Sequence, residues 1–153
     1  MKTLYKFILV VLMVLPLGGR AQCDLPPEYN GNTGSNMTVM LTEDFINSLP
    51  ITTPSTYIVA KTSGGLVVGS EIVSGLSQTA IAVWGDDTAT PEFDGAAANA
   101  AISFQLVDGE TLYDLQMPVP VSFVANGMAF QTSSATVTLN CAPSSEGCMD
   151  ESA

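Results

Sequence analysis

Residues 82–115 of the chain read AVWGDDTATPEFDGAAANAAISFQLVDGETLYDL, and this stretch decides the fold. The apolar run 80–84 is short, so it suits a strand buried on both faces better than it suits a helix. Apolar and polar side chains alternate over 102–107, which is typical of a half-buried antiparallel strand. Asp108-Gly109 is a strong turn signal, and 111–116 is therefore the expected partner strand.

Similar short segments, separated by Gly, Pro, Asn and Ser, recur along the rest of the chain. Turns about every 8–12 residues are typical of β-sandwiches, and the aliphatic, Thr and Ser bias favours strands. The sequence therefore predicts an all-β protein in residues 22–141: an antiparallel β-sandwich, immunoglobulin-like or jelly-roll-like, of about 7–9 short strands. Asn126-Gly127 predicts that 121–125 and 128–131 pair as a hairpin. The other expected strands are 36–42, 56–61, 66–73, 78–84 and 134–140, with one or two helical turns in 43–49.

The N-terminal residues 1–21 have the features of a secretory signal peptide. Lys2 and Lys6 form a positively charged region, and an apolar run follows over 7–17. Gly19-Arg20-Ala21 then ends in a small residue, where cleavage is expected. The apolar run is too short for an ordinary membrane span, so an uncleaved anchor is only the alternative. We therefore expect a secreted protein, extracellular or at the cell surface, with no membrane insertion after signal removal.

Removal of residues 1–21 would leave Lys61 as the one basic residue against fifteen acidic residues, a net charge of −14. Such a surface repels phosphate backbones, which excludes nucleic acid as a partner. It also repels anionic lipid surfaces. The simplest explanation of the charge is a secreted protein whose copies are kept apart by like-charge repulsion.

The chain has three cysteines, Cys23, Cys141 and Cys148, and export makes disulfide bonds expected. Cys141 shares the parity of the apolar residues in 134–140, so it can face the core. A Cys23–Cys141 bond would join both ends of the domain and stabilise it by roughly 4–5 kcal/mol in the chain-entropy model. Cys148 is then unpaired. A Cys141–Cys148 bond, which would close a small local loop, is the rival pairing.

The residues available for catalysis are few. The sequence contains no His, so its Ser and Thr hydroxyls lack their usual general base. Two carboxylates can hydrolyse glycosides, but an acidic chain offers many pairs and none is singled out. Lys61 is interpreted as a solvated charge, with an isopeptide crosslink to an Asn as the alternative. We therefore predict a protein that is not an enzyme and has no catalytic residue.

Asp86, Asp87, Glu92 and Asp94 place four carboxylates within nine residues. Hard oxygen ligands on a loop are what Ca²⁺ binds, so calcium is the one cofactor that the sequence suggests. The spacing is not that of an EF-hand. The alternative is an acidic surface hairpin whose Asp side chains cap turns.

Aromatic side chains offer a second kind of binding site. A planar platform for sugars would need two or three of them exposed together, whereas most such residues pack in the core. The candidates outside the signal segment are Trp84, Tyr29, Tyr57 and Tyr113.

Several motifs resemble a known family. They are GGLVVG (64–69), AVWGDD (82–87), TPEFDG (90–95), ISFQLVDG (102–109) and LYDL (112–115). Together they resemble a recurring β-module, with a WGDD…TPxxDG motif, of large exported bacterial proteins that are often carried by the type IX secretion route. The family often has Gly-Glu where this chain has Asn99-Ala100, so a role of that Glu is absent here.

The ending GCMDESA (147–153) is similar to the start of small Cys-rich repeats of the form GCxDxxACNY, which are common downstream in the same proteins. The resemblance implies that 142–147 is a linker and that 148–153 begins a truncated Cys-rich repeat. The missing part of that repeat would then hold the partner of Cys148. The chain is thus expected to be the N-terminal piece of a longer protein.

These observations favour a non-catalytic secreted module, structural or adhesive, of a larger cell-surface or released bacterial protein. Its expected partners are other domains of the same longer chain and an extracellular glycan or protein. The alternative function is a carbohydrate-binding module accessory to a secreted hydrolase. An exposed aromatic pair on one sheet face near 86–94 would favour that alternative.

Overall fold

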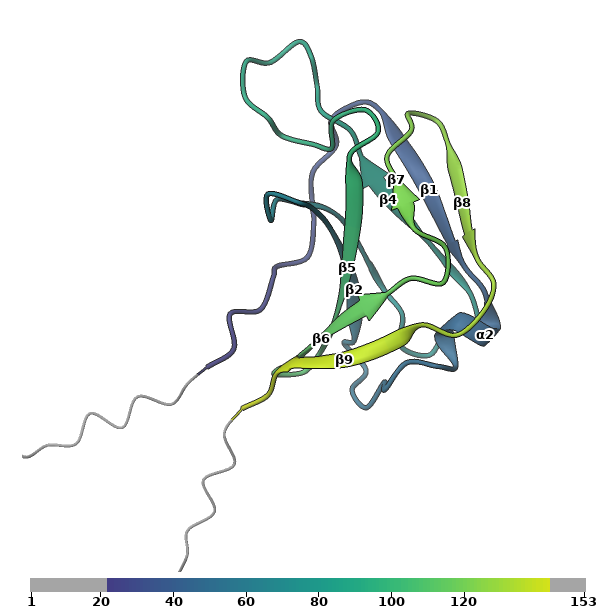
Figure 1. Ribbon diagram of the computed structural model, residues 1–153. Helices are drawn as coiled ribbons and strands as arrows, with labels where there is room; N and C mark the ends of the chain where they lie inside the picture. Colours follow the sequence, from purple (N-terminus) through teal and green to yellow (C-terminus); the bar gives the residue numbers. More distant parts are fainter. Residues whose placement is uncertain (1–21, 144–153) are drawn as a thin grey trace, which may run out of the picture. The chain divides into compact units, whose positions relative to one another are not determined.

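The computed structural model describes residues 22–143, which form one compact unit. Within this range the chain forms nine strands and one short helix (Figure 1). No helix in this range is long and apolar enough to span a membrane. The elements are β1 (Asn36–Leu41), α2 (Glu43–Ile46), β2 (Tyr57–Thr62), β3 (Val67–Ile72), β4 (Thr79–Trp84), β5 (Ala101–Asp108), β6 (Thr111–Gln116), β7 (Val121–Ser122), β8 (Met128–Gln131) and β9 (Thr136–Cys141).

The strands make two sheets. One has three strands in the order β4-β1-β8, and the other has six, in the order β3-β2-β5-β6-β9 with β7 paired to β5. The predicted all-β sandwich of about 7–9 strands is therefore confirmed. One pairing differs from the antiparallel expectation, because β8 runs parallel to β1.

The core lies between the two sheets, and it is filled by alternate residues of the strands, whose side chains point inward. In β1 every second residue is buried, beginning with Met37, and β5 follows the same rule over Ile102, Phe104 and Leu106. Burial of these aliphatic and aromatic side chains is the main favourable term in folding. The larger core set is Met37, Val39, Leu41, Phe45, Ile46, Ile58, Val68, Ile81, Val83, Ile102, Phe104, Leu106, Leu115, Val121 and Phe123.

The strand that ends at Trp84 differs from its prediction. β4 is an edge strand in which only Ile81 and Val83 are buried, while Ala80, Ala82 and Trp84 are half-buried. The expectation that 80–84 is buried on both faces was therefore wrong. A short apolar run does not by itself distinguish a central strand from an edge strand whose outer face carries Ala and Trp.

The turn at Asn126-Gly127 also differs from its prediction. Asn126 has the expected positive φ of 58°, but the segments on its two sides join different sheets. The Asn126 N–H donates to the Asn36 carbonyl at 2.7 Å, and the Gly127 carbonyl accepts from the Thr38 N–H at 2.9 Å. The predicted hairpin is therefore wrong, and the turn is a corner that carries the chain from β7 to β8.

The N-terminal segment 22–30, which we call the strap, crosses the outer face of the six-stranded sheet. The Tyr29 N–H donates to Ser70 Oγ on β3 at 2.8 Å, and the Tyr57 hydroxyl on β2 donates to the Pro26 carbonyl at 2.8 Å. The strap therefore lies against the sheet over several residues.

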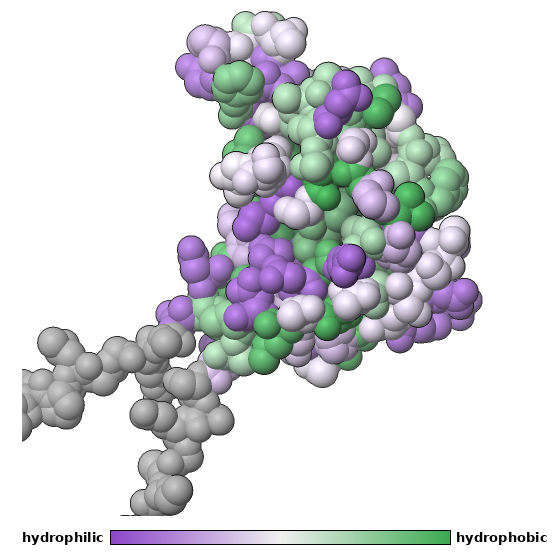
Figure 2. Space-filling model, in the orientation of Figure 1, coloured by the Kyte–Doolittle hydropathy of each residue, from purple (hydrophilic) through white to green (hydrophobic). Residues whose placement is uncertain are grey.

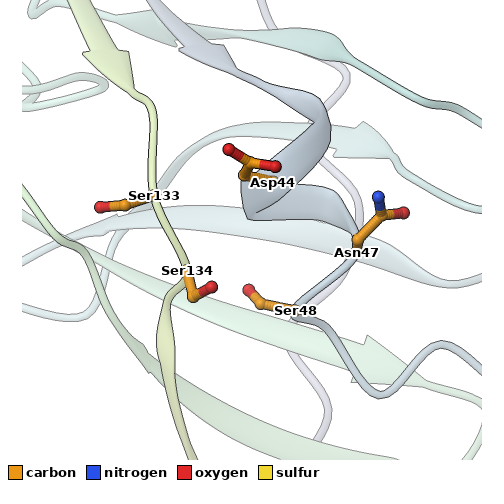
Figure 3. Close-up of a pocket in the computed structure, with 5 residues that line it drawn as sticks. All are labelled: Asp44, Asn47, Ser48, Ser133 and Ser134. Carbon is orange, nitrogen blue, oxygen red and sulfur yellow. The ribbon is translucent and has the colours of Figure 1, made fainter.

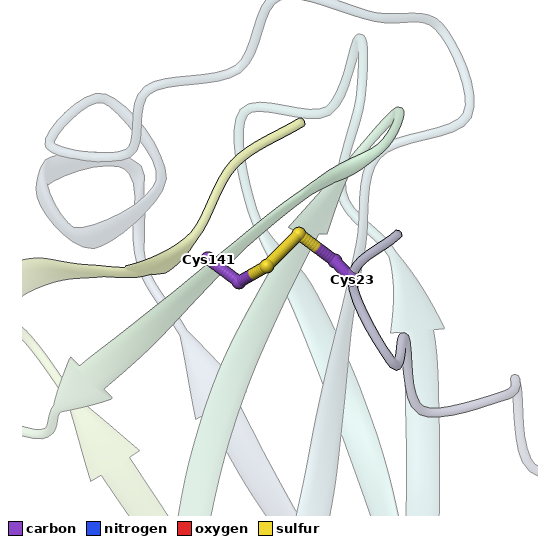
Figure 4. The surroundings of a disulfide bond; sticks show 2 residues. All are labelled: Cys23 and Cys141. Carbon is purple, nitrogen blue, oxygen red and sulfur yellow. A yellow bond between two sulfur atoms is a disulfide. The ribbon is translucent and has the colours of Figure 1, made fainter. Parts of the chain in front are cut away.

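Beneath the strap is a second, smaller apolar cluster. Val59, Val107 and Leu112 point away from the central core, yet each is buried. Cys23 at the start of the strap is bonded to Cys141 on β9, with a Cα–Cα distance of 5.8 Å (Figure 4). This is the predicted pairing, and it fixes the strap over an apolar strip that would otherwise meet water. The predicted core-facing position of Cys141 was wrong, because the bulge in β9 places Cys141 opposite Leu112, on the strap side of the sheet.

Candidate functional site

The WGDD and TPEFDG motifs lie at the two ends of one protruding loop (Figure 1). The backbone closes the base of this loop. The Ala96 N–H donates to the Trp84 carbonyl at 2.9 Å, and the Asp86 N–H donates to the Ala96 carbonyl at 3.0 Å. Gly85 and Ala96 thereby form an isolated parallel bridge. Residues 86–94, the acidic loop, project beyond it.

Three of the four predicted calcium ligands hold the acidic loop together. Asp86 Oδ1 accepts from the Asp94 N–H at 3.0 Å, and Asp94 Oδ1 accepts from the Asp87 N–H at 3.0 Å. Asp87 Oδ1 accepts from the Ala89 N–H at 2.9 Å. The fourth residue, Glu92, is exposed. These bonds pin the loop shape with charge-assisted contacts, as the acidic-hairpin alternative predicts.

The arrangement of these carboxylates does not make a metal cage. Among residues 22–143 no group of three or more His, Cys, Asp or Glu side chains is placed to hold a metal ion. Asp86, Asp87, Glu92 and Asp94 lie on one loop, but three of them are turned toward its own backbone N–H groups. Calcium binding by this loop stays a prediction, and the Discussion describes its test.

The most exposed large apolar side chain among the described residues lies on this loop. Phe93 is 80% exposed, between Glu92 and Asp94. An isolated exposed phenylalanine on a loop that its own carboxylates stiffen is suited to contact with a partner, because little conformational entropy is lost on binding. Figure 2 shows the loop standing out from the body with hydrophilic and hydrophobic surface side by side.

The four aromatic candidates are not brought together. Tyr113 packs against the central core, while Tyr57 bonds to the strap on the opposite face of the same sheet. Burial, then the nearby charge of Glu28, raises the pKa of Tyr57. Burial, then the charge of Asp94, raises the pKa of Tyr29. The three tyrosines therefore do not form one platform.

Trp84 lies apart from the tyrosines, on the outer face of the three-stranded sheet. It is half-buried and ends β4 at the base of the acidic loop. Phe130 on β8 lies on the same face and is exposed. Phe130 is opposite Met40, which is opposite Ala80, four residues along β4 from Trp84. The two rings therefore share a sheet face but do not form an exposed pair near the acidic loop.

Lys61 belongs to a row of polar side chains across the six-stranded sheet. Its Nζ lies 3.1 Å from Gln105 Oε1, and Gln105 Nε2 donates to Asp114 Oδ1 at 2.8 Å. Asn140 Nδ2 donates to the other oxygen of Asp114 at 2.8 Å. Lys61 thus faces a glutamine, and Asn140 bonds to an aspartate at the other end of the row, so this row does not join Lys61 to an Asn.

Sequence reasoning missed one buried charge. Asp108 was read only as part of a turn signal, but its carboxylate is 5% exposed and accepts from two backbone N–H groups and three hydroxyls. The donors are Thr52, Thr53 and Thr56, in the connector before β2; the Thr53 N–H and hydroxyl both lie 2.9 Å from Oδ1. Burial alone would raise the pKa of Asp108, but these hydrogen bonds outweigh it and lower the pKa to about 2.

Gln131 is a second buried polar residue that the sequence did not reveal. Its Nε2 donates to the Val119 carbonyl at 2.9 Å, and its Oε1 accepts from the Val119 N–H at 3.0 Å. The side-chain amide thereby pairs with the backbone between Pro118 and Pro120 as a neighbouring strand would. Prolines at both ends of Val119 leave this segment few other backbone bonds, which explains why β7 is so short.

The surface also has a shallow polar depression of about 330 Å³ between α2 and the segment before β9 (Figure 3). Ser48 Oγ, at its floor, accepts from the Ala135 N–H at 3.0 Å. The lining side chains are Asp44, Asn47, Ser48, Ser133 and Ser134. They include a single carboxylate and no side chain that could act on it, so this depression offers no acid–base pair.

Comparison with known proteins gives no relative: no family model, no curated protein and no solved structure matches the chain. The resemblance to exported bacterial modules therefore stays a prediction. The signal peptide at 1–21, most of the linker 142–147, the Cys-rich repeat at 148–153 and the unpaired Cys148 lie outside the described residues.

Proposed function

We propose that the chain is a non-catalytic, secreted contact module of a larger surface or released protein. The acidic loop is its contact element. The observation that carries the proposal is the structure of that loop: a base closed by backbone hydrogen bonds, an interior held by Asp86, Asp87 and Asp94, and Phe93, which is 80% exposed. A stiff projection with an exposed apolar side chain suits binding rather than turnover of a substrate.

The use of the other carboxylates supports the same function. Asp108 is fully engaged by threonine donors, and Asp114 bonds to Gln105 and Asn140. A general acid or base needs a proton-transfer partner in a cleft, whereas these groups act as structural acceptors. The partner we expect is another domain of the same longer chain or an extracellular glycan or protein.

The test places a photo-crosslinking phenylalanine analogue at position 93 in the protein produced by its own cells. We expect a crosslink to one defined partner. The matched control carries the same analogue at Leu139, an exposed apolar residue on β9. If position 93 gives no crosslink, or gives the same crosslinks as position 139, the acidic loop is not the contact element.

Carbohydrate binding is the second candidate, and the position of Trp84 favours it. Trp84 is half-buried on the outer face of the three-stranded sheet and stands at the base of the acidic loop, whereas Phe130 lies at the other end of that face. A glycan array tests this function with the full chain. Binding that is lost in Trp84→Ala supports a sugar platform, whereas an array without signal excludes it.

A further inference from the structure

β8 is an edge strand whose outer backbone groups can be identified from its register. β8 runs parallel to β1, with Ala129 opposite Val39. The Thr38 N–H donates to the Gly127 carbonyl and the Thr42 N–H donates to the Gln131 carbonyl. Residues 127, 129 and 131 therefore bond to β1, and the N–H and C=O groups of Met128 and Phe130 point away from the sheet.

Apart from its length of four residues, this edge lacks the devices that usually protect a strand edge. Charged residues, prolines and bulges normally blunt such edges. The sequence of β8 is MAFQ, its pairing with β1 shows no register shift, and the side chains of Met128 and Phe130 are 62% and 53% exposed. An uncharged, regular, apolar edge is a template for another strand.

The other sheet edges differ from it, and that of β7 is only two residues long. β3 carries Glu71, and its pairing with β2 has a bulge at Lys61. β9 is bulged against β6 and fixed by the disulfide at its end. β4 lies against β3, so close that a Cβ atom on Gly69 would sit 2.2 Å from the Ala82 carbonyl oxygen. Among the described strands, β8 thus offers the least protected edge.

The chain segment that contains β8 is free of charge in an otherwise acidic chain, and Asp44 of α2 lies near the residues that follow β8. Residues 115–145 contain no Asp, Glu, Lys, Arg or His. Figure 2 shows hydrophobic surface at the side of the molecule where β8 lies. The outer face of the three-stranded sheet likewise carries no charged residue; its side chains are Asn36, Thr38, Met40, Ala80, Ala82, Trp84, Met128 and Phe130.

We propose that β8 pairs antiparallel with β8 of a second copy of this chain, about a two-fold axis at Ala129. Met128 of each copy then lies opposite Phe130 of the other copy. The outward N–H and C=O groups of these residues form four N–H···O=C bonds between the copies. Each thioether lies beside a phenyl ring, a favourable pair. The two three-stranded sheets become one continuous sheet with an uncharged outer face.

Charge explains why the second copy uses this side. Two acidic copies repel one another wherever their carboxylates meet, and this repulsion is smallest at the uncharged outer face of the three-stranded sheet, of which β8 is an edge. A partner that is basic would instead be drawn to the carboxylates elsewhere. The shared edge is short, so the association is weak and strengthens as salt screens the net charge.

The test measures the molar mass of the full chain by sedimentation equilibrium from about 1 µM to about 1 mM, the range expected for a small interface. Cys148→Ser is present throughout, so that a covalent dimer does not contribute. We expect a monomer–dimer equilibrium that tightens with added NaCl. Phe130→Glu places like charges across the axis and should weaken the dimer at least about tenfold.

Two further variants separate strand pairing from other association. Phe130→Pro removes one outward N–H without adding charge and should weaken the dimer as well. Leu139→Glu adds the same charge on β9 and should leave the dimer constant within about twofold, because distant sites act independently. Near-ultraviolet circular dichroism confirms that each variant is folded. A monomer at every concentration, or a dimer that Leu139→Glu weakens and Phe130→Glu does not, overturns the proposal.

Discussion

A Cβ atom at Gly95 would lie 2.0 Å from the carbonyl oxygen of Gly85. The two glycines belong to the WGDD and TPEFDG motifs, and they bring the two ends of the acidic loop into backbone contact. The motif residues thus have a physical explanation. The carbonyls of Trp84 and Ala96 accept the hydrogen bonds that close the base of the loop, and Asp86 and Asp94 accept from backbone N–H groups of the loop. Because Gly95 has no side chain, its backbone can lie against that of Gly85.

Gly95→Ala should therefore disrupt the base of the loop. The backbone must shift to remove the clash, which costs about 1–3 kcal/mol by analogy with overpacked cores. We expect faster amide exchange at Asp86 and Ala96, measured by mass spectrometry or NMR. Gly64→Ala is the matched control, because its nearest neighbour, Thr62 Oγ1, would be 3.8 Å away. Equal exchange in both variants would refute the explanation of the motif.

Substitutions at Asp94 separate a structural role of the loop carboxylates from a metal-binding role. Asn keeps an oxygen that can accept the Asp87 N–H, whereas Ala removes it. We expect Asp94→Ala to speed amide exchange in the acidic loop, without calcium present, and Asp94→Asn to change it much less. If both variants behave alike, the hydrogen bond does not hold the loop.

Calorimetric titration of the parent chain then decides whether calcium also binds. The hydrogen bonds engage one oxygen each of Asp86, Asp87 and Asp94, and we expect the loop to keep its shape without metal. Heat that disappears in the Asp86→Asn, Asp94→Asn double variant would establish a calcium site. A parent chain that gives no heat excludes one.

The sequence predicted best where one face of a strand is buried and the other is not. Alternation over 102–107 located β5, and 111–116 and 128–131 match β6 and β8. These patterns are local, so a window of a few residues contains all the information they need. Parity failed for Cys141, which it placed on the core side: the bulge in β9 turns Cys141 to the face that the strap covers, where it meets Cys23.

What escaped prediction depends on contacts between distant residues. The threonines that donate to Asp108 are separated from it by 52 to 56 positions in the sequence. No residue near Asp108 in the sequence predicts these hydrogen bonds. The side-chain amide of Gln131 bonds to the Val119 backbone as a neighbouring strand would. The Asn126-Gly127 turn carries the chain from one sheet to the other and does not close a hairpin. A turn signal fixes the local backbone but not which sheet each arm joins.

Loss of the Cys23–Cys141 bond should loosen the strap before it unfolds the sandwich. The bond spans 118 residues of sequence, and the chain-entropy model assigns about 4–5 kcal/mol to so long a loop. We expect Cys23→Ser, Cys141→Ser to lower the free energy of unfolding in urea by a similar amount. Amide exchange should rise first in 22–30 and in β2 around Val59, which the strap covers. Cys148→Ser should change neither quantity, and an equal effect there would indicate a different pairing.

Asp108 should make the stability of the protein depend on pH in a defined window. Its folded pKa of about 2 lies below the ordinary aspartate pKa of 3.8. The unfolded state therefore binds the proton first, and stability is fully present above pH 4 and lost as the pH falls toward 2. A shift of this size corresponds to about 2 kcal/mol. Urea unfolding from pH 7 to pH 2 measures this loss.

Asp108→Asn separates this carboxylate from the other acidic groups. The amide turns a donor toward threonine groups that are themselves donors, so we expect the variant to be less stable at pH 7 by about 2–4 kcal/mol. Because the variant cannot titrate at position 108, its stability should fall less between pH 4 and pH 2 than that of the parent chain. Asp114→Asn, at an exposed site, should leave that difference intact. Parallel pH curves for the parent and Asp108→Asn would show that the threonine cluster does not hold Asp108 ionised.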